Sequence, residues 1–206
     1  MSHFAEIPET TVLLLPGWLN SGAQHWQCLW AQKHGAVLID QHDWVTPRRG
    51  DWVAAFETQL LDLHTRTRRS EKLAPRFAVA AHSLGCHLFA AWLAHSAHAD
   101  WINAALLVAP PDLNRDDLPP AVARWAPAIE TPFPRALQAR SLVVGSDNDP
   151  FSSELATRAL AMRWGVEATL KPNAGHLNAD SGLGDWPEGW QQLQQLIDRE
   201  RVKYGH

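Results

Sequence analysis

The sequence predicts an α/β fold in which a mostly parallel sheet of about six strands carries helices on both faces. Short apolar runs rich in Val, Leu and Ile alternate with longer segments of helical period. The runs are apolar on both faces, as expected for parallel strands covered on two sides. The length of 206 residues favours one domain spanning 1–206, because a chain of this size buries enough apolar surface for one core.

The predicted elements follow one another as repeated strand–helix units. Strands are expected over 11–15, 36–39, 77–81, 104–109, 141–144 and 166–170. Amphipathic helices are expected over 24–34, 51–69, 84–97, 152–164 and 188–203. The stretch 110–134 holds seven prolines, which rule out one continuous helix. We expect it to pass over the sheet edge, either covering a site or forming a surface loop with a short helix over 121–125.

Composition excludes several classes of function. The net charge of −4 and the pI near 6.2 supply no broad positive field, so neither nucleic acid nor an anionic membrane is an expected partner. The start of the sequence does not resemble a secretory signal, and no apolar run reaches the roughly 20 residues that span a bilayer. The two cysteines, Cys28 and Cys86, suit a reducing compartment, so a cytoplasmic location is expected.

Metal and nucleotide sites are not predicted either. Eleven histidines are present, but no His-Glu-x-x-His pattern and no ligand cluster accompanies them. The glycines near the N-terminus do not form Gly-x-Gly-x-x-Gly, which argues against a dinucleotide. We therefore expect no cofactor and no metal.

The segment 77–92 has the pattern of a nucleophile elbow. An apolar strand is followed by a tight turn at Ser83 and then by a helix. Such a turn is strained and brings strand and helix close together, so small neighbours are needed, and Ala81 and Gly85 supply them. The usual pattern is Gly-x-Ser-x-Gly, and this chain departs from it at the first small position. The alternative is that Ser83 only caps the helix.

A candidate acid and a candidate base follow the last two predicted strands. Asp149 follows the strand over 141–144, and His176 follows the strand over 166–170. His176 would take the proton of Ser83, while a carboxylate on its other nitrogen would fix its tautomer. Asp149 is favoured for that carboxylate because the following proline holds it extended, and Asp147 and Asp112 remain alternatives. The alternative is that neither residue is catalytic, so that Asp149 only begins a turn and His176 is a solvent-facing loop histidine.

The loop after the first strand, over 15–22, contains two glycines and should lie beside this site. In such an architecture the oxyanion is held by two backbone N–H groups, which predicts Leu84 and Trp18. The alternative is an ordinary strand-to-helix turn. Of the eleven tryptophans, most are expected in the core, and Trp18 and Trp186 are expected to line the substrate pocket.

Two further residues close to Ser83 are assigned structural roles. His82 is expected to be a hydrogen-bonding structural residue whose side chain points away from the nucleophile. Cys86, one turn into the helix, is expected to be buried.

Four blocks of sequence together are similar to a known family. They are Pro16-Gly17 to Ser21-Gly22-x-x-His25-Trp26-Gln27-x-x-Trp30, Ala81-His-Ser-Leu-Gly85, Ser146-x-x-Asp149-Pro150, and Gly175-His176-x-Asn178-x-x-Ser181-Gly182 to Trp186-Pro187. The chain resembles the small serine hydrolases related to retinoblastoma-binding protein 9, especially their bacterial members. The resemblance covers nearly the whole chain. It implies a compact α/β-hydrolase without a large cap domain, with Ser83, Asp149 and His176 as the catalytic triad.

The resemblance also implies hydrolysis of small esters or amides, as a carboxylesterase or amidase, through a covalent acyl-enzyme. An acyl-thioesterase would use the same residues. From a different class, a binding or scaffold protein could keep this fold with little turnover. Neither cysteine lies in a Leu-x-Cys-x-Glu segment, so the retinoblastoma partner is not carried over. The natural substrate and the oligomeric state stay open.

Overall fold

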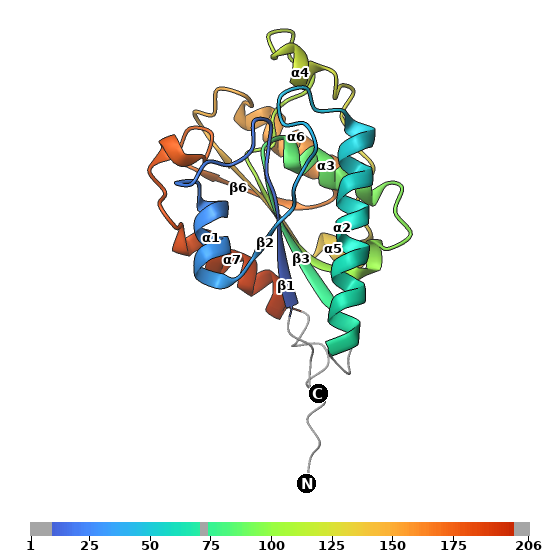
Figure 1. Ribbon diagram of the computed structural model, residues 1–206. Helices are drawn as coiled ribbons and strands as arrows, with labels where there is room; N and C mark the ends of the chain where they lie inside the picture. The colour runs from blue at the N-terminus through green and yellow to red at the C-terminus, as the bar shows by residue number, and fades with distance from the viewer. Residues whose placement is uncertain (1–9, 71–73, 200–206) are drawn as a thin grey trace.

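The computed structural model describes residues 10–70 and 74–199, and its centre is a six-stranded sheet (Figure 1). The strands are β1 (Thr10–Leu15), β2 (Val37–Leu38), β3 (Arg76–His82), β4 (Ile102–Val108), β5 (Ser141–Ser146) and β6 (Glu167–Lys171). Their order in the sheet is β2-β1-β3-β4-β5-β6, and every neighbouring pair is parallel. The fold class predicted from the sequence is confirmed, and the described residues include no large cap.

Helices cover both faces of this sheet (Figure 1). One face carries α1 (Trp26–His34) and α7 (Pro187–Asp198), and the other carries α2 (Arg49–Ser70), α3 (Leu84–Leu93) and α6 (Glu154–Trp164). The short elements are α4 (Pro120–Ala123), α5 (Arg135–Gln138), and the 3-10 turns η1 (Ala99–Trp101) and η2 (Ala179–Ser181). None of the helices in the described ranges is long and apolar enough to cross a membrane.

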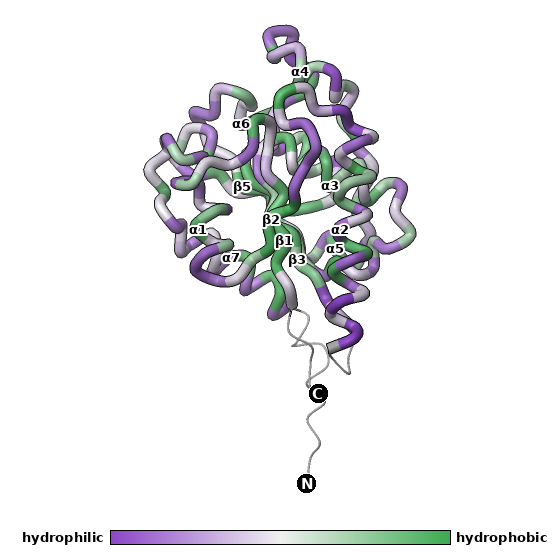
Figure 2. The backbone as a smooth tube through the Cα atoms, viewed as in Figure 1, coloured by the Kyte–Doolittle hydropathy of each residue, from purple (hydrophilic) through white to green (hydrophobic). Residues whose placement is uncertain are grey.

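Alternate residues of the central strands divide the core into two layers. In β1, Leu13 and Leu15 pack with the residues of α2 and α3, whereas Val12 and Leu14 pack with those of α1 and α7. In Figure 2 the strands in the middle of the sheet are green, which marks hydrophobic residues. Because both faces are buried, the strands needed two-sided apolar sequences.

The order of the strands places a crevice at the carboxyl ends of β1 and β3. The chain passes from β1 outward to β2 and then returns to form β3 on the other side of β1. The loops that leave β1 and β3 therefore diverge, and such a switch point is where open α/β sheets bind ligands. The register pairs Leu15 with Ala81 and His82 with Val108, so these strands end at the same level.

Two predicted helices end earlier than expected. The helix predicted over 84–97 ends at Leu93, because Ser96 Oγ accepts the backbone N–H of His98 and donates to Glu57 Oε2, which turns the chain. The helix predicted over 188–203 ends at Asp198, and the positions 200–203 lie outside the described residues. The segment 110–134 contains the short helix α4 at 120–123, close to the expected position.

Candidate active site

Ser83 lies at a sharp turn between β3 and α3. Its backbone has φ 52° and ψ −123°, a conformation that non-glycine residues rarely adopt. The turn is held because the Ser83 N–H donates to the carbonyl of Val108 on β4 at 2.8 Å. The side chain makes no capping hydrogen bond to α3, so the interpretation of Ser83 as a helix cap is wrong.

Close backbone contacts explain the small residues around this turn. A Cβ atom added at Gly85 would lie 2.2 Å from the carbonyl oxygen of Leu15, and one added at Gly17 would lie 2.8 Å from Ser83 Cβ. Both positions therefore need glycine. Ala81, the departure from the usual pattern, is fully buried on β3, where its methyl group packs in the core.

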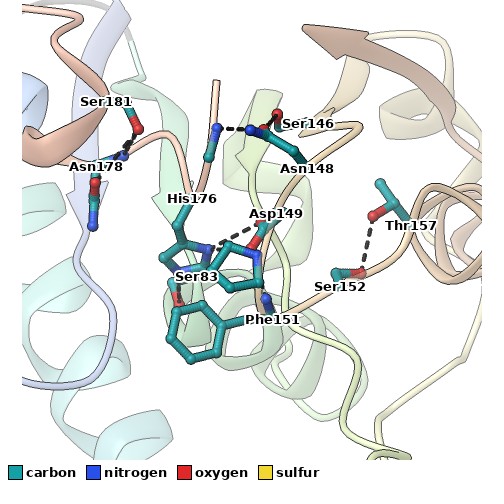
Figure 3. Close-up of polar contacts among 12 residues, drawn as sticks. Ser83, Ser146, Asn148, Asp149, Phe151, Ser152, Thr157, His176, Asn178 and Ser181 are labelled. Carbon is teal, nitrogen blue, oxygen red and sulfur yellow. Dashed lines mark hydrogen bonds and ion pairs between the residues drawn. The ribbon is translucent and has the colours of Figure 1, made fainter. Parts of the chain in front are cut away.

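The structure brings Ser83, His176 and Asp149 together (Figure 3). The Ser83 Oγ lies 2.9 Å from His176 Nε2, and His176 Nδ1 lies 3.0 Å from both carboxylate oxygens of Asp149. The side chains of His176 and Asp149 are 10% and 2% exposed, so the pair is largely shielded from water. The carboxylate accepts the Nδ1–H, which leaves the Nε2 lone pair directed at the serine hydroxyl.

The two alternative acids do not contact His176. Asp147 Oδ1 accepts the backbone N–H of Asn173 at 2.7 Å, and Asp112 Oδ1 accepts that of Asn114 at 3.0 Å. Asp149 Oδ1 also accepts the N–H of Phe151 at 2.9 Å, which fixes the carboxylate beyond Pro150. Geometry therefore selects Asp149 from the three candidates.

Polar side chains after β5 hold the loop that carries His176 (Figure 3). Ser146 Oγ accepts the Ala174 N–H at 2.9 Å, and Asn148 Oδ1 accepts the Gly175 N–H at 2.7 Å. With the Asp147 bond to Asn173, these contacts fix the three residues before His176. We call Ser146, Asp147 and Asn148 the loop clamp. Sequence reasoning missed this role, although the run of short polar residues at a strand end was a signal for it.

The predicted oxyanion groups lie at the same turn. A Cβ added at Gly17 would lie 3.3 Å from the Leu84 nitrogen, so the loop after β1 passes directly against the start of α3. No hydrogen-bond partner for the backbone N–H of Leu84 or Trp18 is found among the described residues. The Leu84 N–H thus lies at the nucleophile turn, and Trp18 follows Gly17 in the loop that passes against this turn.

A cavity of about 320 Å³ opens at Ser83. Its apolar lining comes largely from the segment 110–134 and from Phe151, and its other walls come from the loop after β1 and from residues after His176. The lining residues include Trp18, Leu19, Asn20, His25, Leu84, Pro111, Leu118, Pro119, Val122, Phe151 and Asn178. The segment 110–134 therefore lines the site, which is the first of the two alternatives for it.

Trp18 lies where the sequence predicted, but Trp186 does not. Trp18 lines the cavity, and its indole N–H donates to the carbonyl of Val45 at 2.9 Å. Trp186 is 1% exposed, is not among the lining residues, and packs against Trp26 and Trp30. Placing it in the pocket was wrong, because its ring lies over Gly189 of α7 and fills the core beneath the histidine loop.

Two other residues near the serine, His82 and Cys86, are buried. His82 donates from Nε2 to the carbonyl of His176 at 2.9 Å, as expected of a structural histidine, yet it also lines the cavity. Burial lowers the pKa of His82 well below its usual value, and the neighbouring histidines His25 and His176 add to this. Burial likewise raises the pKa of the Cys86 thiol, which keeps it protonated. In residues 10–70 and 74–199 no group of three potential ligands could hold a metal ion.

Comparison with known proteins identifies the family and the fold of the chain. A family model described as serine hydrolase matches residues 12–195. A putative YdeN-like hydrolase from Pectobacterium atrosepticum is 24% identical, with 91% of this chain and 90% of that chain covered and a TM-score of 0.73. The ydeN gene product of Bacillus subtilis is 18% identical, with 92% and 100% covered and a TM-score of 0.70.

An esterase from Pyrococcus furiosus is 14% identical, with 92% of this chain and 81% of that chain covered and a TM-score of 0.66. A search of curated proteins found no match. The solved structures share the fold, and the family model extends over most of the chain, which confirms the resemblance seen in the sequence. The chain is a member of the serine hydrolase family with an α/β-hydrolase fold.

Proposed function

We propose that this protein hydrolyses small esters or amides through a covalent acyl-enzyme, with Ser83 as nucleophile, His176 as base and Asp149 as the orienting acid. The observation that carries the proposal is the continuous hydrogen-bonded path from Ser83 Oγ to His176 and on to Asp149. Three side chains from three separate loops meet in the order that activates a serine.

Each step of the reaction has a group in place for it. Ser83 Oγ attacks the substrate carbonyl while His176 Nε2 accepts its proton, and Asp149 stabilises the imidazolium that forms. The carbonyl oxygen becomes an oxyanion, which the N–H groups of Leu84 and Trp18 stabilise. His176 then protonates the leaving group. Water attacks the acyl-enzyme by the same route and regenerates Ser83.

The cavity favours small substrates with an apolar portion. A volume of about 320 Å³ is at the lower end of the range for small-molecule sites. Leu118, Val122 and Phe151 offer apolar surface to an acyl or leaving group. The exposed side chains of Leu19 and Phe151, 56% and 37% accessible, extend this surface to the mouth. We expect turnover to fall for chains too long for this volume.

An active-site fluorophosphonate probe tests the proposal. The native protein should be labelled and should hydrolyse short p-nitrophenyl esters, and Ser83→Ala should abolish labelling and lower turnover by on the order of 10⁴-fold. Ser153→Ala is the matched control, since it removes only the cap of α6 and should keep labelling. Unlabelled native protein without turnover would instead favour a binding protein on this fold.

A further inference from the structure

His25 is a buried histidine in the wall of the Ser83 cavity that the proposed triad does not use. It lies just before α1, lines the cavity, and is only 4% exposed. Its ring lies 4.7 Å, centroid to centroid, from that of His82, and the His82 ring lies 4.9 Å from that of His176. The His82 ring therefore lies between His25 and His176, and no hydrogen bond joins His25 to a triad residue in the part of the chain that the structure describes.

The local structure fixes which ring nitrogen of His25 carries the proton. Nδ1 accepts the backbone N–H of Gln27 at 3.2 Å and so caps the start of α1. An accepting nitrogen cannot carry a hydrogen, so the proton of the neutral ring is on Nε2. Burial, with a smaller effect from His176, lowers the pKa of His25 to about 4, which keeps the ring neutral at physiological pH.

The Nε2 atom of His25 is buried and has no hydrogen-bond partner among the described residues. A buried donor without an acceptor costs free energy, so such a group calls for an explanation, and an acceptor brought by a ligand is one. Two further residues that can hydrogen-bond a ligand, Asn20 and Asn178, line the same cavity. Figure 1 shows the loop before α1 and the loop after β6 side by side, and Trp26 Nε1 joins them by donating to the carbonyl of Leu177 at 3.0 Å.

We infer that His25 is a specificity-determining residue whose Nε2–H donates to an uncharged acceptor oxygen of the substrate. This inference rests on the proposed hydrolase function and narrows its substrate class. The substrate is an ester or amide in which one portion is apolar and fits against the segment 110–134. The other portion carries an ether, hydroxyl or carbonyl oxygen within reach of His25. A purely alkyl substrate would leave the donor unpaired.

His25→Asn separates the two roles of this residue. Asparagine is among the best capping residues, so its Oδ1 keeps the bond to Gln27 while the Nε2–H is lost. The first substrates are isosteric pairs of p-nitrophenyl esters, butanoate with methoxyacetate and pentanoate with 3-methoxypropanoate. A second set consists of alkyl esters, in which one member of each pair carries an ether oxygen in the leaving alcohol. For each pair, kcat/KM for the ether ester is divided by kcat/KM for the alkyl ester. This ratio is compared between the native protein and each variant, so that the difference in intrinsic reactivity of the two esters cancels.

In His25→Asn this ratio should fall about threefold to tenfold for at least one pair, the effect of one lost neutral hydrogen bond. The exposed His95→Asn serves as the matched control and should leave every ratio unchanged. Equal effects of His25→Asn on both members of every pair would overturn the inference.

Nuclear magnetic resonance of the histidine rings provides a test that does not need turnover. In Ser83→Ala protein, the His25 signals are identified by their loss in the double variant with His25→Asn. We expect the Nε2-protonated tautomer, and a shift of its N–H signal when an ether ester binds but not when its alkyl isostere binds. A proton on Nδ1, or no difference between the two esters, would overturn the role of His25. Absence of ester turnover in the native protein would instead overturn the proposed function.

Discussion

At the scale of single residues, the site depends on backbone conformations that the sequence enforces. Ser83 has a positive φ, and Gly17 and Gly85 remove the Cβ atoms that would collide with the turn. Asp149 is followed by Pro150, which restricts it to an extended conformation and presents its carboxylate away from α6. Asp149 then accepts the His176 Nδ1–H and the Phe151 N–H together.

The acid is tested by three asparagine variants. Asp149→Asn keeps the shape of the side chain but can hold His176 in the wrong tautomer, so kcat for a short ester should fall on the order of 10³-fold or more. Asp147→Asn and Asp112→Asn keep an oxygen acceptor for their backbone partners and should stay within about threefold of the native rate. Circular dichroism establishes that each variant is folded. Normal turnover by Asp149→Asn would refute its assignment as the acid.

Gly85 is tested by its replacement with alanine. The added Cβ would lie 2.2 Å from a backbone oxygen of the β1 end, which cannot move without disturbing the sheet. Gly85→Ala should lower the free energy of unfolding by about 3 kcal/mol or more. Gly50→Ala, in α2 with no atom near the added Cβ, is the matched control and should have no such cost. Urea unfolding of both variants measures the difference, and equal stability would show that the turn has room for a side chain.

At the scale of elements, β5 and β6 position the base through the loop that follows each of them. The loop clamp accepts the backbone N–H groups of three successive residues before His176. From the opposite side, Trp26 and Trp30 of α1 donate their indole N–H groups to the carbonyls of Leu177 and Asp185. The histidine loop is thus held by hydrogen bonds from both β5 and α1, in addition to the bonds within the loop itself.

Asn148 tests how much this positioning contributes to the rate. Asn148→Ala removes the acceptor of the Gly175 N–H and of the Ser146 hydroxyl, so kcat should fall about tenfold while KM changes little. Asn148→Asp keeps an acceptor oxygen at the same place and should restore most of the rate. Steady-state kinetics on a short ester measure both. A change in KM alone would show that the loop clamp does not position the base.

At the scale of the whole molecule, the core is built around buried tryptophans and histidines. Seven tryptophans are almost fully buried, as the sequence analysis expected for most of them. His25, His82 and His87 are buried too, and burial lowers the pKa of each of them, to about 4 for His25 and His87. His87 donates from Nε2 to the carbonyl of Pro111 at 2.8 Å, which joins α3 to the segment over the site.

These histidines predict that the protein loses stability in mild acid. In the unfolded chain they bind protons at a pKa near 6.5. In the folded chain His25 and His87 stay neutral until about pH 4, and burial also lowers the pKa of His82. The unfolded state therefore holds more protons between these values, and stability falls as the pH drops from about 6.5 to 4, on the order of 3 kcal/mol for His25 and the same for His87.

Urea unfolding at pH 7, 6, 5 and 4 measures this loss. His25→Asn removes one titrating group and should reduce the slope of stability against pH, and a slope equal to that of the native protein would contradict the buried neutral state of His25.

The sequence by itself determined the parallel sheet, the elbow at Ser83 and the order of acid and base. These features depend on local rules: two-sided apolar strands, small residues at a tight turn, and polar residues at strand ends. The sequence placed Trp186 wrongly and did not find the loop clamp or the burial of His25 in the cavity wall. Those features depend on which residues meet across the fold, as Asn148 meets Gly175 and Trp186 meets Trp30. Only the tertiary structure decided them. The packing of elements that are distant in the chain sets which side chains face a cavity and which polar atoms find partners, and the pattern of neighbouring residues does not contain this information.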